Sequence, residues 1–181
     1  MKECDDMIII SGPSTIGKNP LIKRVCQEYK FDYVIPTTTR DMRIEEMNAR
    51  DYFFLTKAEF QDNIRKGKMN EWDYCLNNYY GFYFSFPGTN CHITHGLSRM
   101  ALRIKQQYPD DITTVFLMPK DARKIKTTLE DIYTGTDLML RKALVDEEIT
   151  HSVLFDHVFE VKDSVCELLQ NQRFIALFQN R

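Results

Sequence analysis

The first thirty residues combine an apolar run, a turn and a helical repeat. Residues 7–10 read Met-Ile-Ile-Ile, and a short run rich in β-branched side chains is typical of a strand buried on both faces. A turn framed by Gly12 and Gly17 follows. Apolar side chains then recur at helical spacing to about residue 30, at Leu21, Ile22, Val25, Cys26 and Tyr29. The pattern predicts a strand, a tight turn and a helix.

The remainder of the chain alternates short apolar runs with helical repeats. Strands are predicted at residues 33–35, 90–94, 112–118 and 155–161. Helices are predicted at residues 97–108, 122–129, 138–152 and 165–178, and a loop at residues 130–137. This alternation predicts an α/β fold, in which helices cover both faces of a parallel sheet.

Residues 37–85 interrupt the alternation. Their composition is polar, charged and rich in Tyr and Phe, with a short strand predicted around residues 51–55 and a helix over residues 57–66. Gly67 follows that helix, where glycine commonly ends a helix in a left-handed conformation. The segment is therefore expected to be a subdomain inserted into the core.

The composition limits the classes of function. The 181 residues suffice for one domain, and the net charge of −2 argues against a nucleic-acid partner. No apolar run is long enough to span a membrane, and the N-terminus does not resemble a signal peptide. The five cysteines are scattered without a Cys-x-x-Cys pair, which is typical of reduced thiols in a cytoplasmic protein. The sequence does not indicate an oligomeric state.

The glycine-framed turn matches the phosphate-binding pattern Gly-x-x-x-x-Gly-Lys-[Ser/Thr] at every position except the last. Its residues are Gly12, Pro13, Ser14, Thr15, Ile16, Gly17, Lys18 and Asn19. Backbone N–H groups and the start of the helix would attract an anion, and Lys18 would add a mobile positive charge. Asn19 stands where a hydroxyl usually binds Mg²⁺. An ordinary glycine-rich turn is the alternative, but the spacing of Lys18 favours the phosphate loop.

The inserted segment carries a second candidate phosphate site. Arg40 and Arg43 lie three residues apart among hydroxyl side chains, an arrangement suited to a phosphate dianion. Tyr52 and Tyr80 could each add a neutral hydrogen-bond donor. Taken singly, these residues could equally be surface charges and core aromatics.

Several motifs in order resemble the guanylate kinase family. They are Thr37-Thr38-Thr39-Arg40 with Arg43, Glu46 and Asp51-Tyr52, then Glu71-Trp72, and finally Asn78-Tyr79-Tyr80-Gly81. The resemblance implies a core (residues 1–36, 86–129 and 142–181), a monophosphate-binding insert (37–85) and a lid (130–141). It implies that Thr37, Arg40, Arg43, Tyr52 and Tyr80 hold the phosphate of GMP, and that Glu71 accepts hydrogen bonds from the guanine edge.

Other positions depart from the family pattern. Phe82 stands where a small hydroxyl residue would contact guanine, and Asn19 replaces the hydroxyl of the phosphate loop. We align Cys91-His92-Ile93 with an acidic Asp-x-Asp element that ends a core strand in the family, so both acids are absent. Residues 129–140 contain no basic side chain, which leaves Arg141 as the best match to an ATP-clamping arginine. Cys91, His92 and His95 lack a fourth metal ligand and are expected to be incidental.

These features lead to two functional hypotheses. The first is an ATP-dependent and Mg²⁺-dependent kinase that phosphorylates a nucleoside monophosphate, with GMP as the expected acceptor and with Lys18, Arg40 and Arg141 as catalytic residues. Phe82 would weaken its preference for GMP. The second is a catalytically impaired module of guanylate kinase type that binds a nucleotide or another phosphorylated ligand. Productive binding of ATP with Mg²⁺ would distinguish the two.

Overall fold

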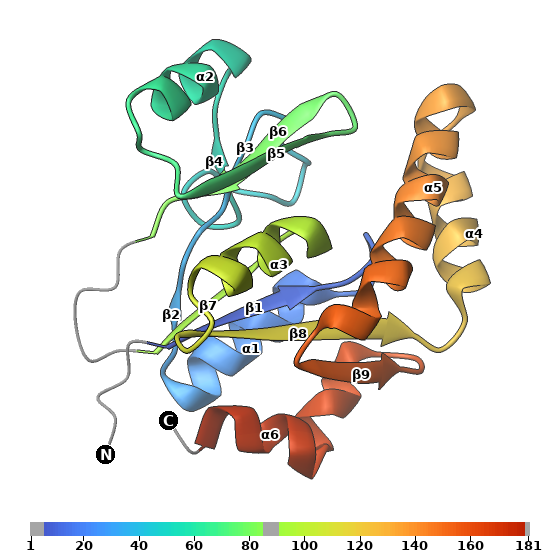
Figure 1. The fold of residues 1–181 in the computed structure, drawn as a ribbon. Coiled ribbons are helices and arrows are strands. Elements are labelled where there is room, and N and C mark those ends of the chain that lie inside the picture. Colours follow the sequence, from blue (N-terminus) through green and yellow to red (C-terminus); the bar gives the residue numbers. More distant parts are fainter. Residues whose placement is uncertain (1–5, 85–90, 180–181) are drawn as a thin grey trace.

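The computed structural model describes residues 6–84 and 91–179 and centres on a parallel sheet (Figure 1). Its strands are β1 (Met7–Ser11), β2 (Asp32–Tyr33), β7 (His92–His95), β8 (Ile112–Pro119) and β9 (His157–Val161). Their order is β2-β7-β1-β8-β9, and each neighbouring pair is parallel. The predicted α/β class is confirmed.

The side chains of β1 alternate between two hydrophobic cores, as the period of a strand requires. Ile8 and Ile10 pack beneath α1 (Lys18–Tyr29) and α6 (Gln172–Gln179). Met7 and Ile9 pack on the opposite face with residues of α3 (Ser98–Gln107). Because both faces of β1 are covered, its end is held rigidly and the turn after it starts from a fixed point.

The inserted segment forms a second sheet of order β4-β3-β6-β5. Its strands are β3 (Thr37–Thr38), β4 (Phe53–Phe54), β5 (Glu71–Cys75) and β6 (Asn78–Phe82). Helix α2 (Lys57–Arg65) packs against this sheet through Phe60, which is fully buried and stacks on Tyr79. As predicted, the helix is followed by Gly67 with a positive φ of 65°. Figure 1 shows the insert on one side of the core sheet, connected to it through the ends of β2 and β6.

The prediction of a loop at residues 130–137 is wrong. Helix α4 (Ala122–Ile132) continues into this segment and α5 (Gly135–His151) begins within it, so only Tyr133 and Thr134 join the two helices. The helices lie side by side (Figure 1), and ion pairs join Lys126 to Asp146 and Lys142 to Glu130. Residues 130–137 are mostly polar and include Gly135, which explains why the pattern predicted a loop instead of helical turns.

The end of the chain also differs from the expected single helix over residues 165–178. A 3₁₀ segment, η2 (Val165–Gln170), precedes α6, and another, η1 (Ser152–Leu154), follows α5. The side chain of Asn171 accepts hydrogen bonds from the backbone N–H groups of Arg173 and Phe174, at 3.0 and 3.2 Å. This capping starts a new helix and explains the break.

Cysteine pairing corrects another expectation. Cys26, Cys75 and Cys166 are free thiols, but Cys91 is disulfide-bonded, and Cys4 lies outside the described residues. The expectation of five reduced thiols is therefore wrong for Cys91. Within the described ranges, every helix is too short or too polar to cross a membrane.

Replacing Gly12 by alanine should destabilise the fold more than the same change at Gly67. Both glycines have positive φ, at 146° and 65°, but a Cβ on Gly12 would lie 2.7 Å from the backbone oxygen of Leu117. A Cβ on Gly67 would meet no atom within 4 Å. We expect Gly12→Ala to lower the free energy of unfolding by about 1–3 kcal/mol, and by more than the control Gly67→Ala. Urea unfolding measures both changes, and equal losses would contradict the close contact.

Candidate active site

A cavity of about 280 Å³ lies where the turn after β1, the insert, α3 and α5 meet. Most of the predicted site residues line it. These are Gly12, Ser14, Thr15, Gly17, Lys18, Asn19, Arg40, Arg43, Tyr52, Tyr80, Phe82 and Arg141. The structure thus brings the phosphate-loop residues and the two arginines of the insert to one space, although they are far apart in the sequence.

The phosphate loop places Lys18 at the first position of α1. Its ammonium group donates hydrogen bonds to the backbone oxygens of Gly12 and Pro13, at 2.5 and 3.0 Å. Burial of the ammonium, opposed by Glu148 and assisted by the nearby Arg43, lowers the pKa of Lys18 to about 8. The lysine thus contacts the backbone of its own loop. A phosphate could replace these carbonyl groups and favour the protonated amine.

Arg40 is held in position before any ligand binds. Its guanidinium makes a bidentate pair with Glu46, with nitrogen–oxygen distances of 2.7 and 2.5 Å, and its Cζ lies 4.9 Å from the ring centroid of Tyr52. Burial is the largest influence and lowers the pKa of Arg40, but the hydrogen bond with Glu46 and the electrostatic effects of Tyr52, Glu46 and Tyr80 together outweigh it, and the net shift is upward. Arg40 thus remains a fixed cation at the cavity.

Arg43 connects the insert to the helical hairpin. Its Nη2 donates a hydrogen bond of 3.1 Å to the hydroxyl of Tyr133, which lies between α4 and α5. The guanidinium of Arg141 lies 3.7 Å from the ring centroid of the same tyrosine, and its Nε pairs with Asp137. One tyrosine therefore contacts two arginines of the cavity lining from two different parts of the fold.

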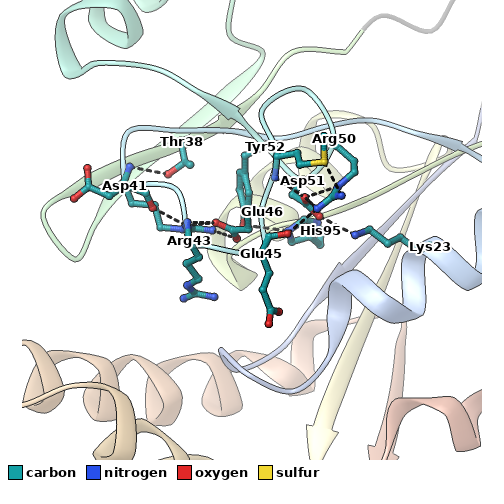
Figure 2. Close-up of polar contacts among 12 residues, drawn as sticks. Lys23, Thr38, Asp41, Arg43, Glu45, Glu46, Arg50, Asp51, Tyr52 and His95 are labelled. Carbon is teal, nitrogen blue, oxygen red and sulfur yellow. Dashed lines mark hydrogen bonds and ion pairs between the residues drawn. The ribbon is translucent and has the colours of Figure 1, made fainter.

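The carboxylate of Asp51 ties the loop that carries Arg43 and Glu46 to the core (Figure 2). It accepts hydrogen bonds from the backbone N–H of Met47 at 3.0 Å, from Arg50 Nε at 2.7 Å and from Lys23 of α1 at 2.9 Å. Burial raises the pKa of this carboxyl, but the three partners outweigh burial and lower the pKa to about 2. Asp51 stays ionised at neutral pH and anchors the loop.

His95 links this loop to the central sheet. It is buried at the carboxyl end of β7, and its ring nitrogens lie 3.0 Å from the hydroxyls of Tyr33 and Tyr52. Burial, followed by repulsion from Lys18 and Arg40, lowers the pKa of His95 to about 3. The imidazole is therefore neutral at pH 7, so one nitrogen donates and the other accepts. Burial also raises the pKa of Tyr52 to about 12, which keeps its hydroxyl protonated.

Four predicted site residues lie outside the lining of this cavity, namely Pro13 and Ile16 of the loop after β1, and Thr37 and Glu71 of the insert. Thr37 is buried in β3, and its neighbour Pro36 lines the cavity instead. Glu71 is buried in β5, where its Oε1 accepts hydrogen bonds of 2.8 and 2.6 Å from Arg103. The carboxylate expected to contact a base is thus paired with an arginine of α3.

The alignment of Cys91-His92-Ile93 with the end of a core strand is also wrong. β7 begins at His92 and ends at His95, so these three residues lie at the opposite end of the strand from the cavity. The cavity is lined instead by His95, Gly96 and Leu97. In a parallel sheet, ligands bind at the carboxyl ends of the strands, and this rule could have identified His95 from the sequence.

Glu148 of α5 is a further lining residue that the sequence reasoning missed. Its Oε1 accepts hydrogen bonds from the backbone N–H and the hydroxyl of Ser98, at 2.8 and 2.9 Å. Burial raises the pKa of Glu148, and the bonds from Ser98 oppose this shift. Its position among polar helix residues gave no sequence signal. Within residues 6–84 and 91–179, no three His, Cys, Asp or Glu side chains form a group that could hold a metal by themselves.

Comparison with known proteins supports one family. The guanylate kinase family model matches residues 5–86. The guanylate kinase of Streptococcus mutans is 30% identical, with 96% of this chain and 90% of that protein aligned. The guanylate kinase of Bacillus subtilis is 31% identical, with 88% and 82% aligned. A crystal structure of guanylate kinase from Anaplasma phagocytophilum superposes with a TM-score of 0.78 at 19% identity, covering 98% of this chain and 87% of that one, and shows the same fold. The chain belongs to the guanylate kinase family.

Proposed function

We propose that this protein transfers the γ-phosphoryl group of ATP to a nucleoside monophosphate, with GMP as the first candidate acceptor. The observation that carries the proposal is the single cavity in which Lys18 of the phosphate loop faces Arg40 and Arg43 of the insert. Two phosphate groups can converge there, one from each side. The relatives named guanylate kinase support this assignment.

In the proposed reaction, the loop from Gly12 to Asn19 binds the donor phosphates. Arg40, Arg43, Tyr52 and Tyr80 bind the acceptor phosphate. An acceptor oxygen attacks the γ-phosphorus, the bond from that phosphorus to the β,γ-bridging oxygen breaks, and ADP leaves with the released electron pair. Protein catalysis of such a transfer consists chiefly of alignment and of cations placed around the transferring group.

Arg141 is the proposed cation on the side of the hairpin. It is the one basic residue of α5 that lines the cavity in the described part of the chain, and the ring of Tyr133 and Asp137 hold it in place. Mg²⁺ bound with ATP would neutralise charge on the donor phosphates, and the amide oxygen of Asn19 is the proposed contact from the loop. We propose that the core, the insert (residues 37–85) and the lid (residues 130–141) are the functional divisions of the chain. The lid would consist of the end of α4 and the start of α5.

ATP affinity should fall as pH rises through about 8. The pKa of Lys18 is lowered to about 8. Above this pH the amine would lose its proton, and with it the positive charge that attracts phosphate. Calorimetry between pH 7 and 9.5 should show weaker binding at the higher pH, with proton uptake on binding near pH 8–9. Lys18→Met should bind ATP more weakly and without the pH step. An affinity that stays constant across this range would contradict the assignment.

The same shift has a defined effect on the stability of the free protein. Between about pH 8 and 10.5, the folded protein binds fewer protons at Lys18 than the unfolded chain does. The contribution of Lys18 to the free energy of unfolding therefore increases with pH in this window.

Removing Arg40 should weaken binding of the monophosphate. Arg40→Ala deletes a charged hydrogen-bond donor, typically a loss of about 1.5–3 kcal/mol of binding free energy. Arg65→Ala is the matched control, because Arg65 belongs to the same insert and pairs with Asp62 on the exposed face of α2 but does not line the cavity. Calorimetric titration with GMP compares them. Equal affinities for Arg40→Ala and the wild type would place the acceptor phosphate elsewhere.

Restoring a hydroxyl at position 19 should improve use of Mg²⁺. Asn19 lines the cavity in the first turn of α1, so a serine or threonine there would offer the hydroxyl typical of phosphate loops. We expect Asn19→Ser and Asn19→Thr to raise turnover or to lower the Mg²⁺ concentration that gives half-maximal rate. Asn19→Ala, which removes the amide without adding a hydroxyl, is the control. If both hydroxyl variants behave like the wild type, another group positions the metal.

A further inference from the structure

The lining of the cavity combines cationic and apolar side chains. The cations are Lys18, Arg40, Arg43 and Arg141. The apolar members include Leu76, Phe82, Leu97 and Met100, together with the thiol of Cys75. A ligand whose phosphate is held by the cations can therefore place the rest of its structure against apolar side chains.

Phe82 borders the cavity but belongs mainly to the core. Its side chain is 1% exposed and packs in a buried cluster with Met100 and Phe116, and a Cβ added to Gly96 would lie 2.7 Å from its Cζ. The ring is thus in direct contact with the backbone that follows β7. At this border of the cavity it offers a base no hydrogen-bonding group.

The carboxylates of β5 are engaged away from the cavity. The Oε1 of Glu71 accepts two hydrogen bonds from Arg103 and one of 3.2 Å from the backbone N–H of Trp72. Its Oε2 accepts one of 3.5 Å from the side chain of Gln107. Asp73 pairs with Arg99 at 2.6 Å and with Arg103 at 3.2 Å. Neither carboxylate is among the residues that line the cavity.

Two polar groups of the lining are also engaged. The Oε1 of Glu148 is bound by Ser98, and His95 is held between Tyr33 and Tyr52. A base that contacts the apolar side chains of the lining therefore does not meet a strand carboxylate that could read its donors.

We infer that this site selects its acceptor through the phosphate and the fit of a flat ring, and that it accepts nucleoside monophosphates with more than one base. The inference rests on the proposed function and narrows its substrate class. Apolar pockets discriminate between similar ligands by roughly 10–200-fold, whereas sites that read hydrogen bonds reach about 10⁴–10⁵. The structure assigns this cavity to the first kind.

GMP and IMP make the sharpest test, because they differ by the exocyclic amine that a carboxylate would recognise. Calorimetry and phosphoryl transfer from ATP are measured for the wild type with GMP, IMP and AMP. We expect dissociation constants for GMP and IMP within about tenfold of each other and AMP within about 200-fold. A preference for GMP over IMP above about 10³ would overturn the inference and leave the proposed function standing. Failure of all three to bind would overturn both.

A pair of variants tests whether the ion pair with Arg103 keeps the Glu71 carboxylate from contacting a bound base. Glu71 is the cross-strand partner of Phe82, so a released carboxylate would lie beside the cavity. Arg103→Gln should increase the preference for GMP over IMP by at least about tenfold. Arg99→Gln is the control, since Arg99 lies on the same helix and also pairs with Asp73 but does not contact Glu71. If the preference for GMP over IMP is unchanged in Arg103→Gln, or changes equally in both variants, the role of Arg103 is overturned. Thermal unfolding measures whether both variants fold.

Discussion

The ion pairs made by two arginines of α3 join the three parts of this molecule. Arg99 pairs with Asp73 of the insert and with Glu147 of α5, and Arg103 pairs with Glu71 and Asp73. Exposed pairs contribute little to stability, but the side chain of Glu71 is only 9% exposed, so removal of its partner would leave a nearly buried charge. Burial is the largest influence and lowers the pKa of Arg103, but the interactions with Glu71 and Asp73 together outweigh it and raise the pKa. This network sets the position of the insert over the cavity.

The proposed function divides the site between two tasks. The cations are held by neighbouring side chains, because Glu46 pairs with Arg40 and Tyr133 contacts both Arg43 and Arg141. The strand carboxylates Glu71 and Asp73 are paired with α3 instead. In the proposed reaction, recognition of phosphate and recognition of the rest of the ligand would therefore rest on different interactions.

The sequence predicted the parts of the fold that depend on short-range patterns. The sequence predicted β1, the glycine turn and a helix beginning near Lys18 from the buried apolar run and the spacing of the glycines. The alternation of strands and helices was sufficient to predict the parallel sheet. The pattern did not predict the helical turns at residues 130–137, because this stretch is mostly polar and contains Gly135. It also gave no sign of Tyr133, Glu148 or Arg103, because their roles depend on contacts between residues distant in the sequence. His95 was not predicted to line the cavity, because the strand was predicted to end at residue 94 and the structure ends it at His95.

The most direct test of the central claim follows the phosphoryl group itself. The protein is mixed with ATP labelled at the γ-phosphate, Mg²⁺ and a nucleoside monophosphate, and the products of a single turnover are separated. The account predicts label in the nucleoside diphosphate, and its loss when Lys18 and Arg40 are both replaced by alanine. Label found only in inorganic phosphate, or retained in ATP although both nucleotides bind, would contradict it.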